Sequence, residues 1–407
     1  SFFMDHFGAF LDADMLRNVL HTDPPEAREL LTPDLGLHLL LYAVLPALVL
    51  ARVRVAERPP LRALGLRASA VAGALVVAAA AIFLQFRDVA TVVRGHRDVR
   101  HLVTPANYLV SLAKVGRDEK AAPAGPRAVV GADAHRVVRT GPARKPRLLV
   151  LAIGETVRSA NFGLSGYARE DTPELARLDP VVFPRVHACG TSTEVSVPCM
   201  FAPVGRRDYD EERIAGQESL LHVLARAGYG VAWIDNQSGC KGVCDGLPSE
   251  RIGGGADPLL CDGERCLDEL LRRRLAAPVA ARPGDLVVVL HMLGNHGPAY
   301  SRRYPPEFRR FTPTCESLDL GTCTPQEIVN AYDNAVLYTD HVLAGVVRDL
   351  ARMTDRETGL IYVSDHGESL GEKGIYLHGL PYRIAPGGPE GEPMVMWHSP
   401  APAPGGS

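Results

Sequence analysis

Two long apolar stretches near the start of the chain constrain its fold more than any other feature. Residues 35–51 and 68–86 contain no Asp, Glu, Lys or Arg. A helix that crosses the hydrocarbon core of a bilayer needs about 20 apolar residues, with roughly 17 as the lower limit. The second stretch is too uniformly apolar for a surface helix, and its length disfavours the alternative, a helix buried in a protein core. Neither stretch opens the chain, so neither is a signal peptide. We therefore predict two membrane spans.

The charges around these stretches predict their orientation. The loop at 52–67 carries five arginines against one acidic residue, Glu57, whereas the segment before the first stretch is mostly acidic. Cytoplasmic loops are enriched in Lys and Arg, which places this loop in the cytoplasm and everything after residue 86 on the other side. Four arginines between residues 87 and 100 count against this assignment.

The cysteines favour the same compartment. All eight lie between residues 189 and 323, and they fall into close couples along the chain. An even number of coupled cysteines in an extracytoplasmic domain predicts disulfides. The pairs expected from sequence proximity are Cys189–Cys199, Cys240–Cys244, Cys261–Cys266 and Cys315–Cys323. A four-cysteine zinc site formed by the two middle couples is the alternative.

From residue 147 onwards, strand-like segments alternate with helix-like ones. Short continuous apolar runs, typical of parallel strands buried on both faces, occupy 148–153, 230–234, 286–290 and 360–363. Helical periodicity is found at 219–227, 266–275 and 326–350. The alternation predicts an α/β domain with a mainly parallel central sheet flanked by helices.

Acidic and imidazole groups that follow two of these strands predict a metal site. Glu155 comes just after the first run, and Asp365 and His366 come just after the last. Ligands at the carboxyl ends of parallel strands converge on one crevice of an α/β sheet. Zinc takes oxygen and nitrogen ligands, and a catalytic site leaves one position open. A plain turn is the alternative for the Asp365–Gly367 motif, and it is disfavoured because Glu155 and His378 accompany the motif.

A loop rich in hydroxyl groups supplies the candidate nucleophile. Residues 189–199 contain several Ser and Thr residues between two cysteines, and a disulfide there would close the loop into a rigid ring. Such a ring would hold one hydroxyl against the metal, which would activate it for attack. The chemistry alone does not choose among the hydroxyls of Thr191, Ser192, Thr193 and Ser196.

These motifs resemble the phosphoethanolamine transferases, and within them the branch that modifies lipid A and includes the colistin-resistance enzymes. The stretches that carry the resemblance are 154–169, 172–173, 189–201, 295–300, 332–334 and 364–372. The resemblance extends over residues 146–395, and residues 1–115 resemble the later part of the family's membrane domain. That domain usually has five spans, so we expect the earlier spans to be missing here and the C-terminal end to be truncated.

The resemblance implies a catalytic domain of the sulfatase/alkaline phosphatase type and a role for each motif. Thr193 would be the nucleophile that carries phosphoethanolamine, and Glu155, Thr193, Asp365 and His366 would hold one tightly bound zinc. His296 and His378 would bind the phosphoryl group, the leaving group or a second zinc. Lys241, His291, Glu368 and, as a weaker match, Gln237 would line the substrate pocket.

The same resemblance implies substrates, compartment and domain limits. Phosphatidylethanolamine would be the donor and a phosphate of lipid A the acceptor, at the periplasmic face of a bacterial inner membrane. We divide the chain into a membrane domain (1–115, the spans followed by interfacial helices), a linker (116–146) and a periplasmic catalytic domain (147–407). The net charge of −3 gives no reason to expect nucleic-acid binding.

Other functions share part of this pattern. A sulfatase would need a Cys/Ser-x-Pro-x-Arg motif, and the nearest string, residues 323–327, ends in Glu and lies near no ligand motif. A phosphodiesterase would use the same ligands with water as the acceptor. Core sugar or periplasmic glucan are alternative acceptors within the family. A membrane-anchored zinc-binding scaffold is the alternative that is not an enzyme.

Overall fold

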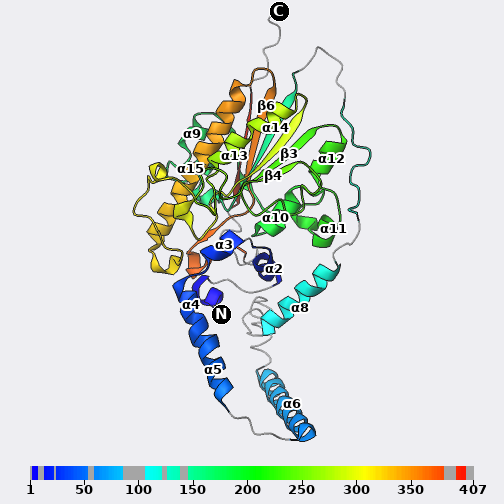
Figure 1. The fold of residues 1–407 in the computed structure, drawn as a ribbon, viewed down its shortest axis with the longest axis vertical. Helices are drawn as coiled ribbons and strands as arrows, with labels where there is room; N and C mark the ends of the chain where they lie inside the picture. The colour runs from blue at the N-terminus through cyan, green and yellow to red at the C-terminus, as the bar shows by residue number, and fades with distance from the viewer. Residues whose placement is uncertain are drawn as a thin grey trace, which may run out of the picture.

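The computed structural model describes residues 2–7, 13–22, 24–53, 59–85, 106–121, 126–137, 145–379 and 391–399. An α/β domain forms the larger body, and the N-terminal helices lie below it in the view of Figure 1, where α5 and α6 extend away from it. The helices before residue 122 are α1 (Phe2–Phe7), α2 (Ala13–His21), α3 (Pro24–Glu29), α4 (Pro33–Leu39), α5 (Leu45–Arg52), α6 (Pro60–Leu84) and α8 (Ala106–Ala121).

Two helices have the length and composition of membrane spans. The first runs over Pro33–Arg52 as α4, a π-helical turn at Leu40–Val44, and α5. The second is α6. Neither is buried by the described part of the protein, so their apolar side chains face outward, as a lipid environment requires. The predicted spans at 35–51 and 68–86 fall on these helices, except that residue 86 lies outside the described residues.

Helix α8 is the described part of the expected interfacial segment. Residues 86–105 lie outside the described residues, so this segment is seen only from Ala106 onwards. The helix continues to Ala121, past the expected domain boundary at 115. Farther along the expected linker, the backbone N–H of Ala128 donates to the carbonyl of Gly216, so this stretch lies against the catalytic domain.

The central sheet has seven strands in the order β2-β9-β6-β1-β5-β3-β4. The strands are β1 (Arg147–Gly154), β2 (Val181–Val186), β3 (Gly230–Asp235), β4 (Ser249–Arg251), β5 (Leu286–His291), β6 (Glu357–Ser364) and β9 (Glu392–His398). The pairs from β6 to β4 are parallel, whereas β9 runs antiparallel to both β6 and β2. A small antiparallel pair, β7 (Ser369–Leu370) with β8 (Tyr376–Leu377), lies outside this sheet. The four predicted strands correspond to β1, β3, β5 and β6.

Helices cover both faces of the sheet, which explains the continuous apolar strands. On one face, α13 (Glu269–Arg274) and the 28-residue α15 (Pro325–Arg352) pack on β1 residues such as Val150. On the other, α10 (Thr193–Met200) and α12 (Leu220–Arg226) pack against Trp233 and Val289. Figure 1 shows α13 and α15 together on one side of the strands and α12 on the other. The remaining helices are α9 (Pro173–Ala176), α11 (Glu211–Ala215) and α14 (Ala276–Ala281).

The strand register brings the predicted ligands to one edge of the sheet. In β1, Ile153 is level with His291 of β5, and Gly154 is level with Ser364 of β6. Glu155 and Asp365 directly follow the last residues of β1 and β6, so both lie at the same level just beyond the end of the sheet. Pairing between neighbouring parallel strands, rather than any local motif, therefore determines where the site forms.

The cysteines form the four pairs expected from sequence proximity. The disulfides join Cys189 to Cys199, Cys240 to Cys244, Cys261 to Cys266 and Cys315 to Cys323. No cysteine is free. The four residues of the alternative zinc site are thus used in two separate disulfides.

Candidate active site

Three side chains at the carboxyl ends of β1 and β6 form a buried cluster suited to a metal ion. One ligand atom each of Glu155, Asp365 and His366 lies within 4.8 Å of the others, and all three residues are fully buried. His366 Nε2 is 3.2 Å from Glu155 Oε1 and 3.4 Å from Asp365 Oδ2. Those two carboxylate oxygens accept no hydrogen bond from the described residues. Buried carboxylate oxygens without a donor are costly unless a cation or a charged group compensates them.

Thr193 lies at the same cluster, at the first turn of α10. Its hydroxyl donates to Glu155 Oε2 at 3.0 Å and lies 3.4 Å from His366 Nε2. Ser192 is the N-cap of this helix, and the disulfide ring at 189–199 encloses both residues. The partial positive charge of a helix N-terminus favours an anionic group there, such as a phosphate. The hydroxyl of Thr193, one of the four candidates, thus contacts the ligand cluster directly.

Charge pairing inside the cluster shifts the pKa values of its members. Burial alone would raise the pKa of Glu155, but the positive charge of the adjacent His366 holds it far below its usual value. Burial and the neighbouring Glu155 raise the pKa of Asp365 to about 6. Although burial opposes it, the charges of Asp365 and Glu155 raise the pKa of His366 to about 10. The carboxylates of Glu155 and Asp365 thus lie on either side of a positively charged imidazole. A bound metal ion would supply that positive charge instead.

A second pair of histidines adjoins the cluster. The ring centroid of His378 is 4.7 Å from that of His366 and 5.3 Å from that of His296. His378 Nδ1 lies 3.4 Å from Glu368 Oε1, and the carboxylate of Glu368 is buried. The structure therefore brings His296, His378 and Glu368 together beside His366.

His291 lies behind the cluster rather than in an open pocket. It is the last residue of β5 and is fully buried. Its Nδ1 is 2.8 Å from Asp235 Oδ2, and the same oxygen accepts a hydrogen bond from Trp233 Nε1. Burial opposes but does not outweigh the charge of Asp235, so the pKa of His291 is raised. The contact with Asp235 fixes the orientation of the imidazole and leaves Nε2 pointing away from Asp235.

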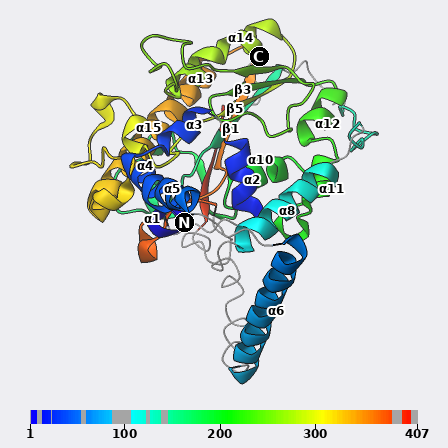
Figure 2. The ribbon, with the colours of Figure 1, turned by 60° about the horizontal axis from the view of Figure 1, so that its bottom comes forward.

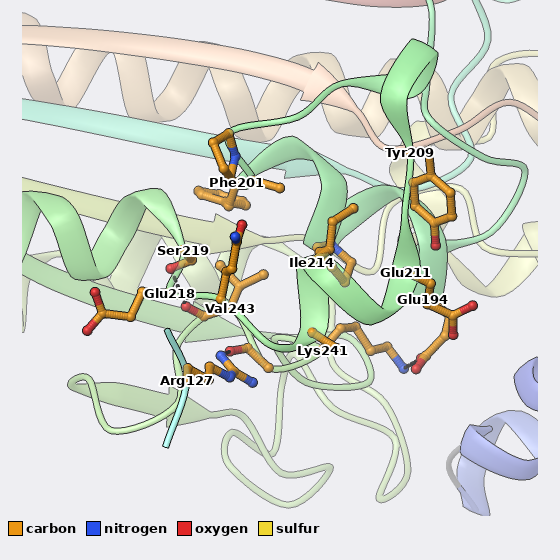
Figure 3. A pocket seen from close by; sticks show the side chains of 16 residues that line it. Arg127, Glu194, Phe201, Tyr209, Glu211, Ile214, Glu218, Ser219, Lys241 and Val243 are labelled. Atoms are coloured by element: carbon orange, nitrogen blue, oxygen red, sulfur yellow. Dashed lines mark hydrogen bonds and ion pairs between the residues drawn. The ribbon is translucent and has the colours of Figure 1, made fainter. Parts of the chain in front are cut away.

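Gln237 and Lys241 come from the loop after β3 and have different neighbours. Gln237 Nε2 donates to Glu155 Oε2 at 3.0 Å, so this residue supports the ligand cluster directly. Lys241 Nζ lies 3.2 Å from Glu194 Oε2, one residue beyond Thr193. Figure 3 shows this ion pair at one end of a cavity of about 130 Å³ that is also lined by Phe201. Lys241 therefore belongs to a cavity beside α10 that polar and apolar side chains line together.

Three residues that support the site were missed from the sequence. Asp235 directly follows the predicted strand at 230–234, so the rule that found Glu155 would also have found it. The hydroxyl of Tyr332 donates to the carbonyl of Thr156 at 2.7 Å, and Glu392 Oε2 accepts from the backbone N–H of Ala188 at 2.8 Å. The last two reach the site from distant elements; the stretch 332–334 carries part of the family resemblance, but it predicts no role for Tyr332, and no local signal marks Glu392.

The sheet order, the covering helices and the cluster at the strand ends define an enzyme domain of the sulfatase type attached to membrane helices. The family model "Sulfatase" matches residues 147–405, and the model "Phosphoethanolamine transferase EptA/EptB" matches residues 1–119. The chain belongs to the phosphoethanolamine transferase family. It is an integral membrane protein whose catalytic domain lies in the periplasm.

Individual relatives agree with the family models. The chain is 39% identical to the phosphoethanolamine transferase EptA of Escherichia coli K12, over 98% of this chain and 73% of that relative. The integral membrane lipooligosaccharide phosphoethanolamine transferase A from Neisseria meningitidis has a similar structure, with a TM-score of 0.94, 40% identity, and coverage of 98% of this chain and 74% of that one. The C-terminal periplasmic domain of E. coli EptC, solved as a complex with Zn, matches with a TM-score of 0.51 and 25% identity, over 63% of this chain and 74% of that one.

Proposed function

We propose that this enzyme transfers phosphoethanolamine from phosphatidylethanolamine to a phosphate of lipid A, with zinc as its cofactor and Thr193 as the covalent carrier. The observation that carries the proposal is the position of the Thr193 hydroxyl, 3.0 Å from Glu155 Oε2 and 3.4 Å from His366 Nε2. A hydroxyl held among metal-binding groups at a helix N-terminus is suited to attack a phosphorus atom.

The donor set fits zinc. Two carboxylates, one imidazole and one hydroxyl are hard and borderline ligands of the kind zinc takes, and Glu155 Oε1 and Asp365 Oδ2 accept no hydrogen bond from the described residues. Glu155, Asp365, His366 and Thr193 would hold this ion. When bound, zinc supplies charge that stabilises the phosphoryl oxygens and makes the threonine hydroxyl more acidic. The Zn complex of the related EptC domain supports the choice of metal. His296 and His378 would bind the phosphoryl group or a second zinc.

The residues of this chain divide the reaction into two displacements. Thr193 Oγ1 attacks the phosphorus of the donor lipid and passes its proton to Glu155 Oε2, to which it donates a hydrogen bond. The bond between phosphorus and the diacylglycerol oxygen breaks, and this oxygen takes up a proton from solvent as diacylglycerol departs. A phosphate oxygen of the acceptor then attacks the phosphothreonine and releases Thr193. The imidazoles of His296 and His378 would stabilise charge on the phosphoryl oxygens, and Lys241 would do the same if its ammonium moved from Glu194 to the phosphoryl group.

The location of the enzyme fits two lipid substrates. The spans hold the catalytic domain at the outer face of the inner membrane, where a lipid donor and a lipid acceptor are both within reach. The transferred group ends in an ammonium, which offsets the negative charge of the acceptor phosphate. We therefore expect the modified membrane to bind less of a polycationic peptide such as polymyxin.

Intact-mass analysis of the full-length protein incubated with phosphatidylethanolamine tests the proposal. The expected result is a phosphoethanolamine adduct on Thr193 that disappears when lipid A is added. Thr193→Ala should form no adduct while the cluster still binds zinc, whereas Thr193→Ser keeps a hydroxyl and should retain part of the adduct. An adduct on Thr193→Ala would show that another residue is the nucleophile.

The same adduct-bearing protein distinguishes lipid A from the alternative acceptors, and a transferase from a hydrolase. Core sugar and periplasmic glucan, offered in place of lipid A, should leave the adduct intact if lipid A is the acceptor. Release of phosphoethanolamine into water at a rate that does not change when any of these acceptors is added would favour a phosphodiesterase.

A further inference from the structure

A buried ion pair joins the membrane domain to the loop that carries His296. Glu29 is the last residue of α3, just before the first span, and its carboxylate lies 2.5 Å from Nη2 of Arg303 in the catalytic domain. The two side chains are 6% and 1% exposed. Figures 1 and 2 both place α3 against the α/β domain. This contact therefore connects two parts of the chain that are 274 residues apart.

Burial makes this pair sensitive to the loss of either partner. Removing one charge from a buried pair leaves the other uncompensated in a medium of low dielectric constant. The ion pair between the adjacent Arg28 and Glu264 also crosses from α3 to the catalytic domain, but its side chains are 61% and 42% exposed. Exposed pairs contribute little because water screens them. The two neighbouring contacts thus differ in burial while they share the same interface.

Arg303 connects the ion pair to the site. Its Nε donates to the backbone carbonyl of His296 at 2.7 Å, while Nη2 contacts Glu29. A guanidinium is planar and rigid, so fixing one edge on a carboxylate fixes the direction of the other N–H groups. The position of the His296 backbone is therefore determined partly by a carboxylate from the membrane domain.

The same segment also contacts the loop that carries His378. A small apolar cluster connects the membrane domain to β8, and its members are Phe2, Met15, Leu35, Tyr376 and Leu377. Met15 Sδ lies so close to Gly379 that a Cβ there would be 3.1 Å from it. Gly379 in turn donates its N–H to the carbonyl of Thr191 at 2.8 Å, inside the nucleophile ring. Both histidines of the second pair are thus supported from the membrane side.

We propose that Glu29 is a positioning residue of this enzyme, which through Arg303 holds His296 in the geometry that phosphoryl transfer needs. Catalysis is then coupled to the docking of the catalytic domain on the α2–α3 segment (residues 13–22 and 24–32). A catalytic domain that separates from this segment loses the support of His296 and works slowly until it docks again. The inference rests on the proposed function, because it assigns His296 to the phosphoryl group or its metal.

Glu29→Gln in the full-length protein tests this role, with Arg28→Gln as the matched control. We expect the single-turnover rate of adduct formation on Thr193 to fall at least tenfold in Glu29→Gln, with the KM for phosphatidylethanolamine within twofold of wild type. Arg28→Gln should keep both values within twofold. Hydrogen–deuterium exchange supplies a readout besides activity, since amides at 294–303 should exchange faster in Glu29→Gln and unchanged in Arg28→Gln.

The outcomes separate positioning from simple docking. A Glu29→Gln enzyme with an unchanged rate, or with a raised KM and an unchanged kcat, overturns the proposal. If Glu29→Gln cannot be purified folded, Glu29→Asp decides, because it keeps the charge but shortens the reach to Arg303 and should show a smaller change of the same kind. The comparison of wild type with Thr193→Ala tests the proposed function independently, whatever Glu29 does.

Discussion

Replacing Tyr332 with Phe removes a hydroxyl that contacts the turn after Glu155. That hydroxyl donates to the carbonyl of Thr156 at 2.7 Å and accepts the backbone N–H of Arg158 at 3.0 Å. Thr156 has a φ of 57°, a left-handed conformation that costs a residue other than Gly about 1–2 kcal/mol. The hydrogen bond from Tyr332 therefore helps to hold a strained residue directly next to Glu155.

The expected loss follows from the two groups left without a partner. Each buried polar group that loses its hydrogen bond costs about 1–3 kcal/mol, so Tyr332→Phe should lower the free energy of unfolding by about 2–6 kcal/mol. For a domain of this size, about 1 kcal/mol changes the melting temperature by roughly 2–4 °C, which gives a drop of roughly 4–24 °C. The rate of transfer should fall as well, because the turn that carries Glu155 loosens.

Tyr362→Phe is the matched control for this measurement. Tyr362 is as deeply buried as Tyr332, but its hydroxyl has no hydrogen-bond partner among the described residues. Removing a buried hydroxyl without a partner should leave the melting temperature unchanged or raise it slightly. Thermal unfolding of the detergent-solubilised protein, followed by fluorescence, compares the two variants. Equal shifts for both would refute the reasoning from hydrogen bonds.

Three further changes test the site and its surroundings. Chelation should lower the melting temperature of the wild type, because the folded state loses about 3 kcal/mol of zinc-binding free energy if zinc is present at 100 times its dissociation constant. The melting temperature of Glu155→Gln should not respond to chelation. An equal response in the two proteins would place the metal at another site. Gln237→Leu should slow adduct formation roughly fivefold, because Glu155 Oε2 loses a donor at 3.0 Å worth about 1 kcal/mol. An unchanged single-turnover rate would contradict that support. Burial and the neighbouring Asp333 raise the pKa of Asp171 to about 8. The folded protein therefore keeps this proton up to about pH 8, whereas the unfolded chain releases it near pH 4. Between these two pH values the free energy of unfolding should fall by about 1.4 kcal/mol per pH unit as the pH rises. Asp171→Asn should flatten that dependence in chemical denaturation, and a slope equal to that of the wild type would count against it.

The parts of the fold that the sequence predicts are those with local signals. The strands β1, β3, β5 and β6 are continuous apolar runs, and the alternation with helices determines the fold class. Strand β2 was missed because it contains Pro184, which normally argues against a strand, and it lies at the edge of the sheet with a register shift after Phe183. Strand β9 was missed as well; it also contains a proline, Pro393, and pairs antiparallel in an otherwise parallel pattern.

The site divides in the same way. Glu155, Asp365 and His366 follow predicted strands, so the geometry of a parallel sheet is enough to bring them together. Thr193 was chosen by resemblance, because the ring at 189–199 offers several equivalent hydroxyls and only tertiary contacts distinguish them. Tyr332 approaches from the N-terminal part of α15, far from the site in sequence; the resemblance includes the stretch 332–334, but only the tertiary contact gives Tyr332 its role.

The contacts of the membrane segment argue that it does more than tether the catalytic domain. If the spans served only as a tether, α3 would not need buried contacts with the catalytic domain. The exposed ion pair between Arg28 and Glu264 would then be enough to keep the two parts together. Instead Glu29 reaches Arg303 in a setting almost free of water, beside the backbone of His296. A buried charge is expensive unless its partner is held in place, so this contact favours one docked arrangement over a loose one. The arrangement that satisfies it is also the one in which His296 is held beside the metal-binding cluster.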